Sequence, residues 1–126
     1  MVFCSGQGPG AFRRERIHYF SDSEHCSYGM KLSACRDAGI TVPVLPGLKP
    51  ISTKKQLSII PRTFHVDIPE ELSTAILKCK TDADVEIVGT EWLLKQSKEL
   101  KAAGVPGLHY YTLGKPHMVS NVVKEL

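Results

Sequence analysis

A chain of 126 residues with 42% apolar residues can bury a core and falls in the size range of one domain. Its net charge of +3, from 16 basic and 13 acidic side chains, does not indicate the concentrated basic face of a nucleic-acid-binding protein. No stretch of the sequence approaches the roughly 20 apolar residues of a membrane span, and the N-terminus carries no apolar signal core. We therefore expect neither a nucleic acid nor a membrane as partner.

The cysteines Cys4, Cys26, Cys35 and Cys79 are widely and irregularly spaced and form no C-x-x-C pair. This spacing fits neither a zinc site nor the disulfide framework of a small secreted domain. His25 stands next to Cys26, but two adjacent residues rarely point at one ion. We expect free thiols, no metal and a reducing, cytoplasmic compartment.

Residues 1–33 show neither strand nor helix periodicity and predict an irregular leader without an assigned role. Their Gly-rich run includes Gly6, Gly8, Pro9 and Gly10, but it does not match the G-x-G-x-x-G pattern of a phosphate loop. No strand is predicted before the run, and Pro9 lacks a backbone donor. A free-standing α/β phosphate binder is therefore disfavoured.

From residue 34 to 126 the pattern favours alternating helices and strands. Residues 34–38 resemble the end of a helix, which Gly39 closes in the left-handed C-cap position. Ile40–Leu45 is mostly apolar and predicts a strand buried on both faces, as in a parallel sheet, which Pro46–Gly47 ends.

Two short helices are expected next. Ser52 is a candidate cap for the first, which runs through Ile60 and is stopped by Pro61. Asp67–Glu71 begins the second, because proline and acidic side chains suit a first helical turn. The apolar residues of the second helix follow at helical spacing: Leu72, Ala75, Ile76 and Cys79.

Thr81–Asp84 matches the start of a capping box and predicts a long helix that ends at Gly104. One face of this helix carries Val85, Val88, Trp92, Leu93, Gln96 and Leu100. We assign Trp92 to packing. Val105–Leu113 then predicts a second strand.

Pro116 predicts the first residue of a last helix. Its apolar residues are Val119, Val122, Val123 and Leu126. The two expected strands are joined by a crossover of about sixty residues, which implies a parallel pair. Because two parallel strands alone do not make a stable sheet, further strands are needed, and a closed α/β barrel takes roughly 250 residues.

Two segments resemble a known family. Ala38–Ile51, which reads AGITVPVLPGLKPI, is similar to the penultimate strand of methylenetetrahydrofolate reductases. Gly104–Leu113, which reads GVPGLHYYTL, is similar to the final strand of that family. The resemblance covers residues 34–126, and the order and spacing of the segments also fit. It implies an α/β fold that forms the C-terminal part of a (β/α)8 TIM barrel, incomplete and preceded by the leader.

By this resemblance the parent enzyme transfers a hydride from NAD(P)H through FAD to 5,10-methylenetetrahydrofolate and gives 5-methyltetrahydrofolate for methionine synthesis. In the family, the acidic proton donor and most flavin contacts precede the matching segments. We therefore expect no catalytic residue in this chain, no identifiable cofactor-binding residue, and no activity of the chain alone. A homo-oligomer is expected for the full-length protein.

The resemblance assigns three substrate-binding positions. Gln56 is expected to hydrogen-bond the folate, and Tyr111 to line the pocket shared by nicotinamide and pterin. Lys115 stands where the family often has arginine, facing the folate tail carboxylate, and it keeps the charge without the bidentate fork. Strand alternation puts Tyr111 on the face of His109 and opposite Tyr110. The alternatives are an exposed glutamine, a packed tyrosine and a solvated lysine.

Other polar residues receive no role. His65 and His109 are expected to be structural, and hydrolase chemistry lacks a G-x-S-x-G motif. Ile60 stands where some family members stack an aromatic ring, so such stacking is not expected here. A different class of function is also open, namely a noncatalytic barrel remnant that pairs with another chain. Its unsatisfied strand edges would then favour self-association.

Overall fold

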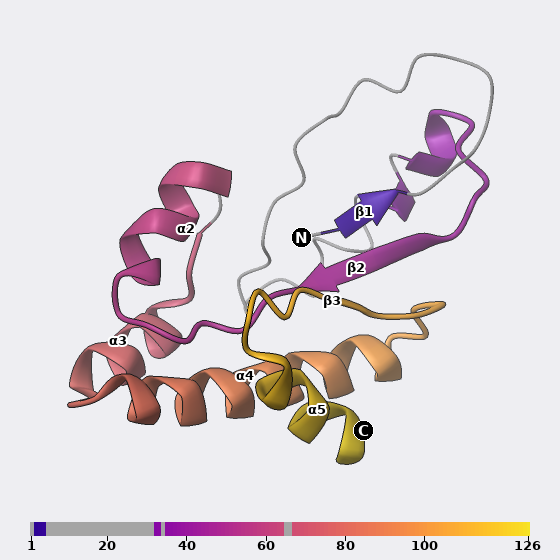
Figure 1. Cartoon of the computed structure of the whole chain (residues 1–126). Coiled ribbons are helices and arrows are strands. Elements are labelled where there is room, and N and C mark those ends of the chain that lie inside the picture. Colours follow the sequence, from indigo (N-terminus) through magenta and orange to yellow (C-terminus); the bar gives the residue numbers. More distant parts are fainter. Residues whose placement is uncertain (1, 5–31, 34, 65–66) are drawn as a thin grey trace.

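The computed structural model describes residues 2–4, 32–33, 35–64 and 67–126, and for residues 2–4 and 64 it describes only the backbone. The labelled elements combine strands and helices in an α/β arrangement (Figure 1). They are β1 (Val2–Cys4), β2 (Val44–Leu48), α2 (Gln56–Phe64), α3 (Glu70–Lys78), α4 (Asp82–Ala102), β3 (His109–Tyr110) and α5 (Pro116–Lys124). None of the helices described is long and apolar enough to span a bilayer.

The three strands form a sheet in the order β1-β2-β3. β2 and β3 are parallel, with Gly47 opposite His109 and Leu48 opposite Tyr110, as the long crossover predicts. β1 pairs with β2 in the antiparallel sense. The prediction of an irregular leader is therefore wrong for residues 2–4, which form a strand, and residues 5–31 lie outside the described part.

A helix end precedes β2, as predicted. The N–H groups of Gly39 and Ile40 donate to the carbonyls of Arg36 and Cys35, which closes the helix in a Schellman motif with Gly39 at φ +79°. The Arg36 guanidinium then donates to the carbonyls of Ile40 and Val42. Because these carbonyls are bonded locally, residues 40–42 join the helix to the strand and do not form a strand themselves.

β2 therefore begins and ends later than predicted. The expected strand was Ile40–Leu45 with Pro46–Gly47 as its end, whereas the observed strand is Val44–Leu48. Pro46 and Gly47 are both buried within it. Pro46 has no N–H for a ladder, and the pairing with β3 begins one residue later, at Gly47. The proline is thus accommodated at the start of the parallel pairing.

β3 is much shorter than the expected strand Val105–Leu113, since only His109–Tyr110 pairs. The Val105 N–H is used to close α4 through the Leu100 carbonyl, at 3.4 Å. At the other end, Leu113 has φ +40°, which no strand residue adopts. Local turn chemistry on both sides therefore limits the strand.

α2 also departs from the prediction, because it begins at Gln56 and continues through Pro61 to Phe64. Ser52 is not its N-cap, since the backbone N–H groups of Gln56 and Leu57 bond back only to Thr53 and Lys54. Because Pro61 has no N–H, the helix lacks the hydrogen bond that residue 61 would otherwise donate to the carbonyl four residues earlier. It does not end the helix, as the sequence suggested.

α3, α4 and α5 lie where the sequence predicts them. Pro69 is the N-cap of α3, and Pro116 is at the first position of α5. At α4, the Thr81 hydroxyl accepts the Asp84 N–H at 3.2 Å, and the Asp84 carboxylate accepts the Thr81 N–H at 2.9 Å. The predicted capping box is confirmed, and its N–H donors hold the pKa of Asp84 below its usual value.

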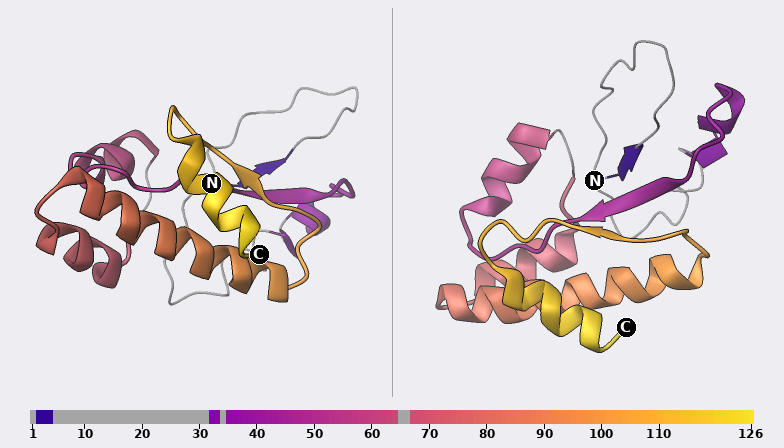
Figure 2. Two further views of the ribbon diagram at one scale, coloured as in Figure 1. Left: turned by 60° about the horizontal axis from the view of Figure 1, so that its bottom comes forward. Right: turned by 45° about the vertical axis from the view of Figure 1, so that its right-hand side comes forward.

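Two apolar clusters hold the helices to the sheet and to each other. The first joins the chain after β2 to α2, α3 and α4 through Ile51, Ile60, Leu72, Ile76 and Val85. The second joins β2 to α4 and α5 through Leu48, Leu93, Val119 and Val122. Figure 2 shows α4 and α5 on the same side of β2 and β3. Of the apolar residues of α5, Val119 and Val122 are buried, whereas Val123 is 56% exposed.

Gly89 lets α4 approach the chain that leaves β2. A Cβ at this position would overlap the carbonyl oxygen of Ile51. Glycine is unfavourable in a helix interior, so its presence here reflects this close approach of two backbones. The contact fixes the distance between the β2 exit and the helix layer.

Candidate functional site

The parallel pairing brings the C-terminal ends of β2 and β3 to the same edge of the sheet. Leu48 is the last residue of β2, and Tyr110 is the last residue of β3 and its partner. The Tyr111 N–H then donates to the Leu48 carbonyl oxygen at 2.8 Å, which extends the pairing beyond β3. Parallel α/β folds bind ligands beyond the carboxyl ends of their strands. The segments that follow Leu48 and Tyr110, called here the β2 exit and the β3 exit, form the candidate site.

Gln56, the first residue of α2, is oriented by the β2 exit. Its Oε1 accepts the backbone N–H of Ser52 at 2.7 Å, and the Ser52 hydroxyl lies 3.5 Å from the same oxygen. The amide nitrogen has no hydrogen-bond partner among the described residues. Since an amide nitrogen carries two donors, Gln56 can offer N–H groups to a ligand while its oxygen remains bonded to the loop.

Tyr110 and Tyr111 face opposite sides of the sheet. The Tyr110 hydroxyl donates to Ser97 of α4 at 2.8 Å, so this ring faces the helices. The Tyr111 ring meets the His109 ring edge-on, with centroids 4.7 Å apart. Partial burial raises the pKa of the Tyr111 phenol, which favours its neutral form further. The predicted alternation is confirmed, with Tyr111 on the side of His109 and away from Tyr110.

Lys115 is the N-cap residue of α5 and follows the turn at the β3 exit. Its Nζ donates to Glu86 Oε1 of α4 at 2.5 Å, and Glu86 Oε2 bonds His117 Nε2 at 2.9 Å. These two hydrogen bonds hold the pKa of the Glu86 carboxyl below its usual value. The Lys115 side chain is 43% exposed. The β3 exit thus presents a cation that is fixed from α4 and still open to solvent.

The three predicted substrate-binding residues come from both exits. Tyr111 and Lys115 follow β3, whereas Gln56 begins the helix that follows β2. The strand pairing places the two exits at one edge. The hydrogen bonds of Gln56 and Lys115 run to separate partners, Ser52 and Glu86, so each side chain is oriented independently.

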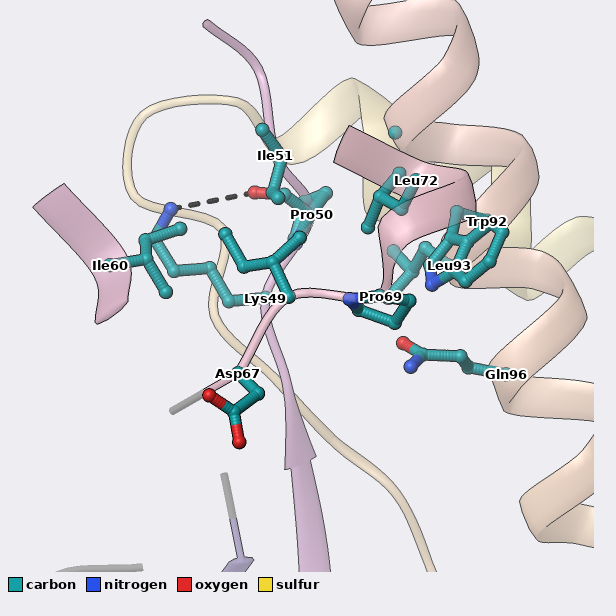
Figure 3. A pocket seen from close by; sticks show the side chains of 12 residues that line it. Lys49, Pro50, Ile51, Ile60, Asp67, Pro69, Leu72, Trp92, Leu93 and Gln96 are labelled. Atoms are coloured by element: carbon teal, nitrogen blue, oxygen red, sulfur yellow. Dashed lines mark hydrogen bonds between the residues drawn. The ribbon is translucent and has the colours of Figure 1, made fainter. Parts of the chain in front are cut away.

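A small pocket of about 30 Å³ lies beside the β2 exit. Figure 3 shows the Lys49 side chain passing Ile60, with Trp92 and Gln96 on the side of α4. Burial lowers the pKa of Lys49, whose Nζ lies 3.4 Å from the Pro50 carbonyl. Trp92 Nε1 is buried and finds no acceptor within the described part of the chain. The pocket has room for about one water molecule, not for a folate or a nucleotide.

The first core cluster fixes the roles of two side chains beside this pocket. Ile60 is 2% exposed and lies within the cluster. Trp92 packs against the cluster, and Lys95 Nζ lies 4.6 Å from the centre of its ring. Both side chains therefore contribute to packing, as the sequence predicts for Trp92.

The family of the chain follows from comparison with known proteins. The model of the methylenetetrahydrofolate reductase family matches residues 20–126. The chain belongs to this family. The match begins at residue 20, upstream of the residues 34–126 that carry the resemblance, and residues 20–31 lie outside the described part.

Curated relatives carry the same family name. A 5,10-methylenetetrahydrofolate reductase of Salmonella typhimurium is 33% identical over 106 residues, which cover 83% of this chain and 35% of the relative. A probable methylenetetrahydrofolate reductase (NADPH) of Caenorhabditis elegans is 30% identical over 73% of this chain and 14% of its own length. A methylenetetrahydrofolate reductase (NADH) 1 of Arabidopsis thaliana is 35% identical over 63% of this chain and 14% of its own length. The chain thus spans about a third or less of these relatives.

Two structural determinants escaped the sequence reasoning. Gly89 interrupts the apolar pattern of a long helix, and a glycine there is the signal that another backbone comes close. Glu86 gives no such signal, because an acidic residue on an exposed helix face is ordinary. Its role follows from its bonds to Lys115 and His117 on a different element.

Proposed function

We propose that this chain supplies folate-binding elements of a methylenetetrahydrofolate reductase. In that enzyme a hydride passes from NAD(P)H through FAD to 5,10-methylenetetrahydrofolate and gives 5-methyltetrahydrofolate. The observation that carries the proposal is the placement of Gln56, Tyr111 and Lys115 at adjacent strand exits of a chain that belongs to this family. The parent fold is then a (β/α)8 barrel, of which β2 and β3 are the last two strands.

The three residues have distinct roles in this proposal. Gln56 donates its amide N–H groups to the folate, since its oxygen is bonded to Ser52. Tyr111 lines the pocket for pterin and nicotinamide with a neutral ring. Lys115 binds a carboxylate of the folate tail as a point charge. These groups bind and orient the substrate, and the acidic proton donor lies in another part of the enzyme.

By the family resemblance most flavin contacts precede the matching segments, so no described residue is assigned to FAD. The pocket beside Lys49, at about 30 Å³, encloses neither a flavin nor a folate. A wider groove of about 340 Å³ lies on the helix side of β3 and is lined by Val105, Leu108, Tyr110, Val123 and Leu126. We therefore assign the flavin to other parts of the enzyme and derive no step through it.

The proposal extends to the setting of the enzyme. The full-length protein is a cytoplasmic homo-oligomer that acts on a small-molecule substrate, without nucleic acid or membrane partners. The 126-residue chain alone does not oxidise NADH or NADPH when FAD is supplied. Flavin-dependent oxidation by the purified chain would overturn this part of the proposal.

Calorimetric titration with 5-methyltetrahydrofolate tests the folate-binding roles. Gln56→Glu keeps an oxygen for the Ser52 N–H but removes the amide donors, and Lys115→Ala removes the cation. Each change is expected to weaken binding about tenfold, which is about 1.4 kcal/mol. Lys124→Ala, at the exposed end of α5, is the matched control and should bind like the unchanged chain. Absence of binding, or equal affinities in all variants, would reject the proposal.

A further inference from the structure

A bridge of charged side chains joins α4 to the β3 exit. The Glu86 carboxylate uses one oxygen for Lys115 Nζ, at 2.5 Å, and the other for His117 Nε2, at 2.9 Å. Its side chain is 21% exposed, whereas those of Lys115 and His117 are 43% and 56% exposed. The carboxylate is thus the inner member of the bridge and is held at both oxygens.

The backbone alone does not fix the Lys115 ammonium. The Lys115 N–H donates to the Thr112 carbonyl at 2.8 Å across a tight turn, in which Leu113 and Gly114 have φ +40° and +84°. This turn sets the Lys115 Cα at the start of α5. The four-carbon side chain remains flexible, so the position of the charge depends on what the ammonium contacts.

We propose that Glu86 is a positioning residue that holds the Lys115 ammonium ready for an anionic ligand. The inference rests on the proposed function only in identifying that ligand as the carboxylate of a folate tail. An ammonium has three donors, of which Glu86 takes one. Since the Lys115 side chain is partly exposed, the remaining donors are open to a ligand. His117 keeps the carboxylate in place from its other oxygen.

The opposite effect of Glu86 would be competition, in which the carboxylate occupies Lys115 and must be displaced by the ligand. The two effects differ in sign. If Glu86 positions Lys115, its removal weakens binding, because the ligand must then immobilise a flexible side chain. If Glu86 competes, its removal strengthens binding.

NMR on the 126-residue chain separates these effects. The first readout is the mobility of the Lys115 ammonium without ligand, measured by relaxation of its side-chain nitrogen signal. Glu86→Gln should make the ammonium mobile, and Glu91→Gln should not, although it removes the same charge from an exposed position of α4. Equal mobility in the unchanged chain and Glu86→Gln would overturn the proposal.

The second readout is titration with 4-aminobenzoyl-glutamate, which carries the two carboxylates of a folate tail. Glu86→Gln should bind this probe about fivefold more weakly, and Glu91→Gln should bind it like the unchanged chain. Glu86→Asp, which keeps the charge on a shorter stem, should recover part of the affinity. Unaltered or tighter binding by Glu86→Gln would overturn the proposal.

The two readouts also separate this inference from the proposed function. If the unchanged chain binds no probe while Glu86→Gln still frees the Lys115 ammonium, the folate role of Lys115 fails and its positioning by Glu86 stands. Thermal unfolding of each variant is measured in parallel. A purely structural role would lower the unfolding temperature of Glu86→Gln and leave the affinity of its folded fraction unchanged, which would contradict the proposal.

Discussion

The two strand exits are held in place by different forces. At the β2 exit, Pro50, Ile51 and Ser52 are buried, and the backbone of Ile51 presses on Gly89 of α4. At the β3 exit, residues 112–114 are exposed, a backbone hydrogen bond from Lys115 to Thr112 closes the turn, and an ion bridge to Glu86 of α4 holds the Lys115 ammonium. The parallel sheet places both exits at one edge. Packing then holds one of them, and charge and turn geometry hold the other.

This difference predicts different sensitivities. The β2 exit should respond mainly to changes in side-chain volume, because its packing contacts are apolar and its cation, Lys49, donates only to a backbone carbonyl among the described residues. The β3 exit should respond to pH and ionic strength, because partly exposed charges are screened by salt. Substitutions that change side-chain volume and changes in pH or salt can therefore distinguish packing at the β2 exit from charge interactions at the β3 exit.

The largest effect is expected from Gly89→Ala. The added methyl group would overlap the carbonyl oxygen of Ile51, and a backbone atom cannot move aside as a flexible side chain can. We expect a loss of about 3 kcal/mol or more in the free energy of unfolding, measured by urea denaturation. Gly107→Ala is the control, because its Cβ would meet only the end of the Leu45 side chain, at 3.2 Å. Equal stability of the two variants would show that the β2 exit is not tightly packed.

The next effect is expected from Ile60→Ala in α2. Ile60 is 2% exposed in the first core cluster, whereas its neighbour Ile59 is 53% exposed. Ile60→Ala should lower the free energy of unfolding by about 2–4 kcal/mol through lost burial and a residual cavity. Ile59→Ala makes the same change on the exposed side of α2 and should lower the free energy of unfolding by much less than Ile60→Ala does. Similar losses in the free energy of unfolding for both variants would show that Ile60 is not a core residue.

A smaller effect is expected from Tyr110→Phe at the β3 side. The Tyr110 hydroxyl donates to Ser97, whose own hydroxyl donates to the Leu93 carbonyl at 2.7 Å. Removal of one neutral hydrogen bond should cost about 1 kcal/mol. A double-mutant cycle with Ser97→Ala measures the coupling of the two side chains. A coupling energy of zero would mean that the hydroxyls do not stabilise the contact between sheet and α4.

Acid is expected to break the bridge between Glu86 and Lys115, and so to free the Lys115 side chain at the β3 exit. The hydrogen bonds from Lys115 and His117 hold the pKa of the Glu86 carboxyl below its ordinary value, so its folded pKa is lower than its unfolded value. Such a carboxyl stabilises the fold above the unfolded pKa, and this contribution is lost as pH falls through the folded pKa.

The Lys115 side-chain signals report this loss. They should shift as pH falls below 4.5 in the unchanged chain, and should not shift in Glu86→Gln. The variant also separates Glu86 from Asp84, whose pKa is lowered as well. The same pH-dependent shift in Glu86→Gln would mean that another group controls the exit.

Local backbone chemistry made much of the helical structure predictable. The capping box of Thr81 and Asp84, the helix end at Gly39 and the proline at the start of α5 each act within a few residues. Such motifs bond to their own segment, so the sequence alone specifies them. The alternation that separates Tyr110 from Tyr111 is likewise a local property.

The predicted ends of strands and helices are wrong mainly where contacts between residues far apart in the sequence determine the structure. Pro46 reads as the end of a strand, yet it is buried within β2, where it lies opposite Val2 of β1 and the pairing with β3 begins at the next residue. Pro61 reads as a helix stop, yet α2 continues beside the buried Ile60. At both prolines tertiary packing overrides a local preference. The short β3 has a different cause, because local turns limit it on both sides.

The candidate site was only partly predictable for a similar reason. Gln56, Tyr111 and Lys115 were assigned from resemblance, and the structure adds the partners that orient Gln56 and Lys115. Those partners are Ser52, four residues away, and Glu86, on another helix. A partner on another helix leaves no periodic signal in the sequence, so Glu86 could be recognised only from the fold.

We propose that the exits of β2 and β3 together bind a folate. The most direct test is to map the amide shifts of the chain by NMR during titration with 5-methyltetrahydrofolate. We expect the largest shifts at residues 49–56 and 111–117, which follow the two strands. Shifts centred on Leu108, Val123 and Leu126, in the groove on the helix side of β3, would contradict the claim, as would the absence of shifts at both exits.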